Sequence, residues 1–187
     1  QLSLNVSLAG QTYFQAGDVA RPYVMGSTGA TTFAGLAESA TGSAAANAAI
    51  RARRASFEAI ANAGLNSTSN TLYERSFASV QQRAVEFADR GNASIAGARP
   101  FVALPDAGVT LSPLQQQLRT VAKMISARAS LSMSRQVFFV STGGFDTHDD
   151  LVADQPGLLG NVSNSIKTFF DALAEVGMEN SVTLFTH

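Results

Sequence analysis

Two short apolar runs, separated by a helix-length amphipathic segment, constrain the fold of this chain more than any other feature. The first run covers residues 136–142 (QVFFVST) and the second covers residues 181–186 (SVTLFT). Between them, apolar residues recur at spacings of three and four, which predicts a helix that starts near Pro156 and ends at Gly177. A crossover helix of this length makes the two predicted strands parallel and their connection right-handed. We therefore expect an α/β fold with a mostly parallel sheet flanked by helices.

A further helix is predicted before the first apolar run. Ser112 and Pro113 form a strong helix start, because a hydroxyl residue caps a helix well and proline is favoured at its first position. The apolar residues that follow keep helical spacing to about Ser130. Residues 112–187 are accordingly predicted to form an α-β-α-β segment.

The N-terminal region, residues 1–42, alternates short apolar stretches with Gly, Pro, Ser and Thr. Residues 2–8 (LSLNVSL) show the period of two that is typical of a half-exposed strand. The remainder of this region has no regular period and indicates loops. Residues 1–42 are therefore predicted to be a strand and loop region.

A helical hairpin is predicted at residues 43–91. Its first helix covers about 43–63 and is closed by Gly64, and its second covers about 71–90 and is ended by Gly91. A short polar link between two helices is typical of an antiparallel pair. The residues expected to face inward are Ile50, Phe57 and Ile60 on the first helix, and Leu72, Phe77, Val80, Ala84 and Phe87 on the second.

Composition limits the classes of partner. The chain has 187 residues, a net charge of -1 and no Cys. Near-zero charge gives no electrostatic reason to expect nucleic acid or an anionic membrane as a partner. The absence of Cys excludes disulfides, thiolate metal ligands and a Cys nucleophile. No apolar run approaches the length of a membrane span, about 20 residues, and the basic cluster at residues 51–54 (RARR) is interpreted as a solvated helix face.

The two ends of the sequence indicate a partial domain. The chain begins at Gln1, in sequence that already has the pattern of a folded protein, and it stops at His187 directly after an apolar run. We therefore expect residues 1–187 to be a partial single domain, an internal fragment of a longer protein.

The first apolar run leads into a turn, residues 143–148 (GGFDTH), that supplies residue types found in metal sites. In open parallel sheets, ligands bind beyond the carboxyl ends of the strands, where this turn is expected to lie. Asp146 and His148 offer a carboxylate oxygen and an imidazole nitrogen, which suit a divalent metal. The paired glycines before them allow a backbone with positive φ, so the two side chains can converge. Asp146 and His148 are therefore candidate metal ligands.

Two ligands are too few for a tight metal site. A third and a fourth would come from Asp149, from Asp150 or from residues outside this chain. His187 is expected on the same rim of the sheet, because it follows the second predicted strand. The Asp-x-His pattern also admits a structural interpretation, in which Asp146 caps the following helix or stabilises the turn and His148 donates to a backbone carbonyl.

The predicted helix at 114–129, the strand at 137–142 and the GGFDTH turn together resemble the bacterial DUF1501 proteins, whose hallmark is this succession. That family is similar to the alkaline phosphatase/sulfatase superfamily. The resemblance implies an alkaline-phosphatase-like sheet, incomplete in this chain, with one or two divalent metals at the strand ends. It also implies that Asp146 and His148 are ligands of a metal such as Zn, Ca, Mg or Mn.

The chemistry implied by the resemblance is metal-dependent hydrolysis of a small anionic substrate, a phosphate or sulfate ester. The nucleophile of that superfamily lies in a segment that this chain does not include, so the catalytic residue is unknown. Members of the family often carry twin-arginine leaders, which implies export to the periplasm of a bacterium. The alternative is a non-catalytic binding or scaffold protein that retains the same fold and uses the helices at 43–90 as an interaction surface.

Overall fold

The computed structural model describes residues 5–17, 22–33, 35–39, 41–66 and 71–186. These residues have an α/β fold with four α-helices and one three-stranded parallel sheet. The chain divides into two compact units. We call residues 1–30 and 91–187 the sheet unit, and residues 31–90 the hairpin unit.

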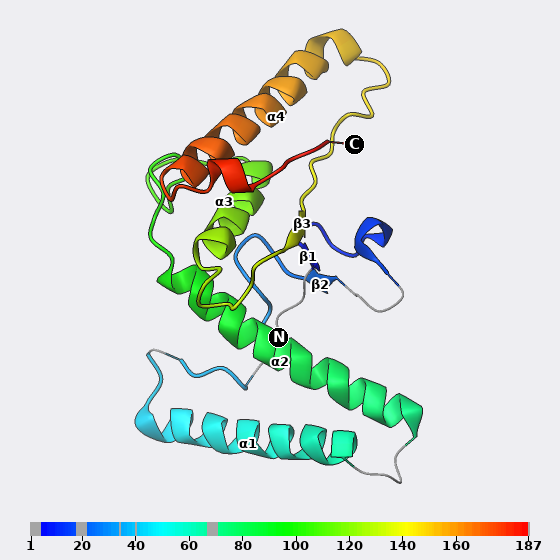
Figure 1. The fold of residues 1–187 in the computed structure, drawn as a ribbon, viewed down its shortest axis with the longest axis vertical. Helices are drawn as coiled ribbons and strands as arrows, with labels where there is room; N and C mark the ends of the chain where they lie inside the picture. The colour runs from blue at the N-terminus through cyan, green and yellow to red at the C-terminus, as the bar shows by residue number, and fades with distance from the viewer. Residues whose placement is uncertain (1–4, 18–21, 34, 40, 67–70, 187) are drawn as a thin grey trace. The chain divides into compact units, whose positions relative to one another are not determined.

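The sheet consists of three short strands in the order β2-β1-β3. β1 (Asn5–Ser7) is central, and β2 (Tyr23–Val24) and β3 (Val137–Phe139) pair with it on either side, as Figure 1 shows. Both pairings are parallel. The parallel sheet expected from the sequence is confirmed, although β3 is shorter than the predicted strand at 136–142, and residues 2–4 of the predicted first strand lie outside the described residues.

The centre of the sheet is buried on both faces. Val6 lies opposite Tyr23 of β2 and opposite Phe138 of β3. Neighbouring side chains of a strand point to opposite faces of the sheet, and both Val6 and Ser7 are fully buried. Burial on both faces is the usual situation of a strand inside a parallel sheet.

The second predicted strand, residues 181–186, does not form in the described part of the chain. Glu179–Ser181 make a short 3-10 helix, η2, and the backbone is then extended at Val182 (φ -123, ψ 131) without joining the sheet. β-branched residues favour extended backbone, but a strand also needs a neighbour that pairs its N–H and C=O groups. β3 pairs with β1 instead. The described residues after Ser112 therefore form α-β-α and an extended tail, and the α-β-α-β prediction was wrong at its last element.

Helix α3 (Pro113–Ser126) begins where the sequence predicted. The Ser112 side chain accepts from the backbone N–H of Gln115, and the Gln115 side chain accepts in return from the backbone N–H of Ser112. This capping box satisfies donors that would otherwise lack partners at the helix start. Much of the core of the sheet unit lies on α3, through its buried residues Leu114, Leu118, Val121, Ala122, Met124 and Ile125.

Helix α4 (Leu151–Ala174) packs against α3 in the sheet unit (Figure 1). It begins before Pro156, so that the proline lies inside the helix. Its end is close to the predicted position: Gly177 takes φ +65, and the N–H of Met178 donates to the carbonyl of Leu173 at 2.9 Å. A left-handed glycine followed by such a bond is a common way to terminate a helix.

The hairpin unit contains α1 (Ala44–Asn66) and the part of α2 (Leu72–Gly97) up to Arg90. The predicted pair of helices is therefore present, but both predicted ends were wrong. Helix α1 continues past Gly64, and α2 continues through Gly91, which is buried within the helix. Glycine disfavours a helix interior by only about 1 kcal/mol, which burial of neighbouring side chains offsets.

The inward faces of the hairpin differ from those predicted. Phe87 is buried as expected, whereas Ile60, Leu72, Phe77 and Val80 are exposed. The other buried apolar residues of the two helices in this unit are Ala61, Ala78, Val85 and Ala88. Among the helices of the described residues, none is long and apolar enough to cross a bilayer.

Candidate functional site

The candidate site is the segment at 143–148, the predicted turn, which follows β3; its backbone is irregular as far as Thr147 and turns only from His148. Beyond Phe139 the chain passes through the two glycines and reaches α4, whose N-cap residue is Asp150. Gly144 has φ +96, a conformation that favours glycine. Because β3 runs parallel to β1, the chain leaves the sheet here at the end where open α/β sheets bind their ligands.

Asp146 and His148 come together in this turn. The Oδ1 of Asp146 lies 2.9 Å from the Nε2 of His148. Both side chains are largely open to solvent, at 86% and 80% exposure respectively. Thr147 lies between them, and its Oγ1 is buried without a hydrogen-bond partner in the structure. The middle residue of the triplet therefore turns inward, while the carboxylate and the imidazole face outward as a pair.

The geometry of this pair fits two neighbouring ligands of one metal ion. Two donors that bind one metal at about 2.0–2.2 Å and subtend about 90–109° lie roughly 2.9–3.5 Å apart. The observed separation of 2.9 Å is at the short end of that range. A carboxylate oxygen and an imidazole nitrogen are also donors that Zn²⁺ and other divalent transition metals accept. At 2.9 Å the two atoms are in direct hydrogen-bond contact, so a metal bound by both would replace this contact with one bond from each side chain.

The other candidate ligands do not join the pair. Within the described ranges, no group of three or more His, Asp and Glu side chains is placed to hold a metal. Asp149 and Asp150 therefore do not complete a site here, and His187 lies outside the described residues. The structural interpretation of Asp146 as a helix cap is wrong, because Asp150 holds that position and makes no side-chain capping bond.

Gln117 of α3 holds the chain just before the turn. Its Nε2 donates to the carbonyl of Ser141 at 2.9 Å, and its Oε1 accepts from the N–H of Ser141 at 3.1 Å. Both backbone groups of Ser141 are thereby satisfied by one side chain. Nothing in the spacing of the sequence pointed to this contact, because Gln117 and Ser141 are 24 positions apart and glutamine on a helix is usually solvated.

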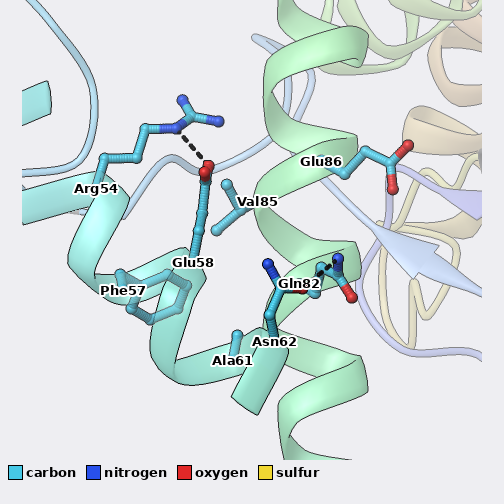
Figure 2. A pocket seen from close by; sticks show the side chains of 8 residues that line it. All are labelled: Arg54, Phe57, Glu58, Ala61, Asn62, Gln82, Val85 and Glu86. Atoms are coloured by element: carbon cyan, nitrogen blue, oxygen red, sulfur yellow. Dashed lines mark hydrogen bonds and ion pairs between the residues drawn. The ribbon is translucent and has the colours of Figure 1, made fainter. Parts of the chain in front are cut away.

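A separate cavity of about 160 Å³ lies between α1 and α2 in the hairpin unit (Figure 2). Arg54 lines it, donates to Glu58 at 2.8 Å and forms a two-bond pair with Asp89. Hydrogen bonds to Asp89, and secondly to Glu58, raise the pKa of the Arg54 guanidinium. The remaining lining residues are Phe57, Ala61, Asn62, Gln82, Val85 and Glu86. No His lies among them, and the cavity contains no part of the turn at 143–148.

The basic cluster at residues 51–54 is used within the hairpin unit. Arg51 pairs with Glu38 at 2.8 Å, and Arg53 donates to the carbonyl of Gly35 at 3.0 Å. Together with the contacts of Arg54, these bonds attach the preceding loop and α2 to α1. The cluster is thus a structural feature of the hairpin, in line with the interpretation of a helix face.

Comparison with known proteins adds no further constraint on the site. No family model, no curated protein and no solved structure matches the chain.

Proposed function

We propose that this chain supplies two ligands of a divalent metal site, Asp146 Oδ1 and His148 Nε2, in a hydrolase that cleaves small phosphate or sulfate esters. The observation that supports the proposal is their separation of 2.9 Å, on a turn at the carboxyl end of a parallel strand. The resemblance of the GGFDTH turn to DUF1501 proteins gives the reaction class. The finer assignment of an alkaline-phosphatase-like fold rests on the same resemblance, and the parallel pairing of β1 and β3 is compatible with it.

The two side chains would have different tasks. Asp146 offers a negatively charged oxygen, and His148 offers a neutral nitrogen lone pair. Since one donor is nitrogen, Zn²⁺ suits the pair better than Ca²⁺, Mg²⁺ or Mn²⁺, which favour oxygen ligands. A metal held here would neutralise the charge of an ester and lower the pKa of a bound water. Export to the periplasm, as the resemblance implies, is compatible with a chain that has no Cys.

The exposure of the pair defines what else such a site needs. With 86% and 80% of the two side chains open to solvent, the substrate can approach from outside the sheet unit. The same exposure leaves at least two coordination positions to be filled by water, by substrate or by other residues. The pair on its own is therefore expected to bind a metal weakly, with tighter binding wherever further ligands converge on this rim.

Titration calorimetry of the full chain with Zn²⁺ and with Mn²⁺ tests the proposal. We expect Asp146→Ala and His148→Ala each to weaken binding at least tenfold, because each removes one of two protein ligands. The matched control is Asp154→Ala, which removes an acidic side chain from the first turn of α4 outside the turn. In a protein that also carries the nucleophile, turnover of aryl phosphates and aryl sulfates is expected to fall in the same two variants. Unchanged metal binding in both would refute the assignment of the ligands.

The alternative, a binding or scaffold protein, is favoured by one observation in the hairpin unit. Leu72, Tyr73 and Phe77 of α2 are 70%, 86% and 66% exposed. Exposed apolar side chains at this density are typical of surfaces that bind another molecule. The alternative expects Tyr73→Ser with Phe77→Ser to reduce association, measured by sedimentation velocity, in a protein that shows neither metal binding nor turnover.

A further inference from the structure

The attachment of Gln117 to Ser141 lies at a point where the sheet gives no support. β3 ends at Phe139, so Ser141 is beyond the last residue that the ladder with β1 holds. Gln117 supplies both bonds that a neighbouring strand would otherwise supply, at 2.9 and 3.1 Å. The side chain thus extends the ordered part of this segment to within five residues of Asp146.

Gln117 is itself well fixed. It lies in the second turn of α3, between Leu114 and Leu118, which are both buried. The capping box at Ser112 stabilises the start of the same helix. A side chain that projects from a packed and capped helix loses little further freedom when it binds a loop. Gln117 therefore connects the turn to the most buried helix of the sheet unit.

The turn has a second attachment at its middle. A Cβ built on Gly144 would come within 3.2 Å of Leu158 Cδ2, so the backbone there lies close against α4. With Ser141 held by α3 and Gly144 held against α4, the path of the chain into Asp146 is restricted from both sides. Only the first of these two attachments depends on a polar side chain that can be replaced without a change in volume.

We propose that Gln117 is a positioning residue for the Asp146–His148 pair. This positioning role rests on the proposed function in one respect, namely that the pair binds a metal. Loss of the two bonds to Ser141 would let the chain before the turn sample more conformations, so that the carboxylate and the imidazole meet less often in the geometry that a metal requires. Gln117 itself touches neither the pair nor a bound ion.

The chain offers a closely matched control for this role. Gln116 is the same residue type one position earlier on α3, and its Nε2 donates to the carbonyl of Leu111 at 3.0 Å rather than to the segment before the turn. Methionine is unbranched, has nearly the volume of glutamine and has a similar helix propensity. Gln117→Met and Gln116→Met therefore differ mainly in whether the bonds to Ser141 are lost.

Two measurements on the full chain separate positioning from general stability. The first is Zn²⁺ affinity by calorimetry: we expect about a three- to fivefold loss in Gln117→Met, because the bonds to Ser141 are exposed and water replaces part of their contribution, and less than about twofold in Gln116→Met. The second is amide hydrogen exchange: the N–H groups from Ser141 to His148 should exchange faster in Gln117→Met than in Gln116→Met. Gln117→Glu, which keeps the acceptor and loses the donor, should lie between the parent and Gln117→Met in both measurements.

The outcomes distinguish this inference from the metal assignment. If Asp146→Ala weakens Zn²⁺ binding but Gln117→Met binds as the parent does, the positioning role is wrong and the assignment of the ligands stands. If Asp146→Ala leaves Zn²⁺ binding unchanged, the metal assignment fails, and hydrogen exchange alone decides. Faster exchange in the turn of Gln117→Met then supports the positioning role, whereas equal exchange in the two Met variants overturns it.

Discussion

Gly144 lies so close to Leu158 of α4 that Leu158 would have to shift slightly to admit a side chain at this position. A Cβ built on Gly144 comes within 3.2 Å of Leu158 Cδ2, and the residue has φ +96. Both restrictions favour glycine, one through space and one through backbone conformation. Gly143, directly before it, has no atom within 4 Å of an added Cβ and is not among the glycines with positive φ. Of the two adjacent glycines, only the second is therefore required by the structure.

We expect Gly144→Ala to lower the free energy of unfolding by about 1–2 kcal/mol, because alanine is strained at positive φ and Leu158 must shift. Gly143→Ala should leave the free energy unchanged or raise it slightly, since alanine reduces the freedom of the unfolded chain. Urea denaturation followed by circular dichroism measures both values. Equal effects of the two substitutions would show that neither restriction at Gly144 matters.

Asn92 of α2 binds Ala30 through two bonds, much as Gln117 binds Ser141. Its Oδ1 accepts from the N–H of Ala30 at 2.8 Å, and its Nδ2 donates to the carbonyl of Ala30 at 2.9 Å. Ala30 is buried, so its backbone groups have little access to water once Asn92 is removed. We expect Asn92→Leu to destabilise the sheet unit by about 2–3 kcal/mol, measured by urea denaturation.

The control for this prediction is Asn47 of α1, which makes the same two bonds to Ser39, at 3.0 and 3.1 Å, in an exposed setting. Water can replace those bonds, so Asn47→Leu should cost less than about 1 kcal/mol. If Asn47→Leu lowered the free energy of unfolding more than Asn92→Leu does, burial of the bonded backbone groups would not be the cause of the effect.

Features that depend on local chemistry could be predicted from the sequence. The start of α3 at Ser112 and Pro113 was predicted correctly, because capping and the fixed φ of proline act within one helical turn. The helix stop at Gly177 has the same local origin. The segment at 143–148 lies between β3 and α4, as predicted, although its backbone is irregular as far as Thr147 and turns only from His148.

Features that depend on distant partners could not be predicted. The sequence at 181–186 favours extended backbone, but whether it pairs depends on which strand lies beside β3, and that neighbour is β1. The continuation of α2 through the buried Gly91 also could not be predicted, because it is decided by packing rather than by helix propensity. For the site, spacing identified Asp146 and His148, whereas their separation and the contact from Gln117 required the three-dimensional arrangement.

Glu175, directly after α4, is predicted to make stability depend on pH. Its two carboxylate oxygens accept from the N–H groups of Ala103 at 2.9 Å and Val102 at 3.0 Å, and Arg99 lies 3.6 Å away. Partial desolvation raises the pKa of Glu175, but these hydrogen bonds and Arg99 outweigh it, so that the pKa is lowered overall. A lowered pKa means that the folded state favours the ionised form.

The direction of the pH effect follows from that shift. The stabilisation by Glu175 is fully present above the pKa of the unfolded chain, about 4.3, and it is lost as the pH falls through the lower pKa of the folded state. We expect Glu175→Gln to cost about 1–2 kcal/mol at pH 7 and clearly less at pH 3, measured by urea denaturation. Asp171→Asn, which breaks an exposed pair with Lys167 on the same helix, should cost about 0.5 kcal/mol or less. If Glu175→Gln lowered the free energy of unfolding by the same amount at pH 7 and pH 3, the charge of Glu175 would not contribute to stability.

Arg54 is predicted to need the shape of its guanidinium and not only its charge. It forms two parallel bonds with Asp89 of α2 and a third with Glu58 of α1, the last of which Figure 2 shows. Lysine keeps the charge but cannot make the two-bond fork. Because these groups are partly exposed, we expect Arg54→Lys to lower the stability of the hairpin unit by only about 0.5–1 kcal/mol.

The control for Arg54 is Arg51, which makes a single exposed bond to Glu38. Lysine can replace a single bond, so Arg51→Lys should be neutral within about 0.3 kcal/mol. Thermal unfolding followed by circular dichroism, at low salt and at high salt, measures both variants. The difference between them should persist at high salt, because it arises from geometry, whereas a difference that disappears with salt would mean that long-range attraction alone holds the two helices together.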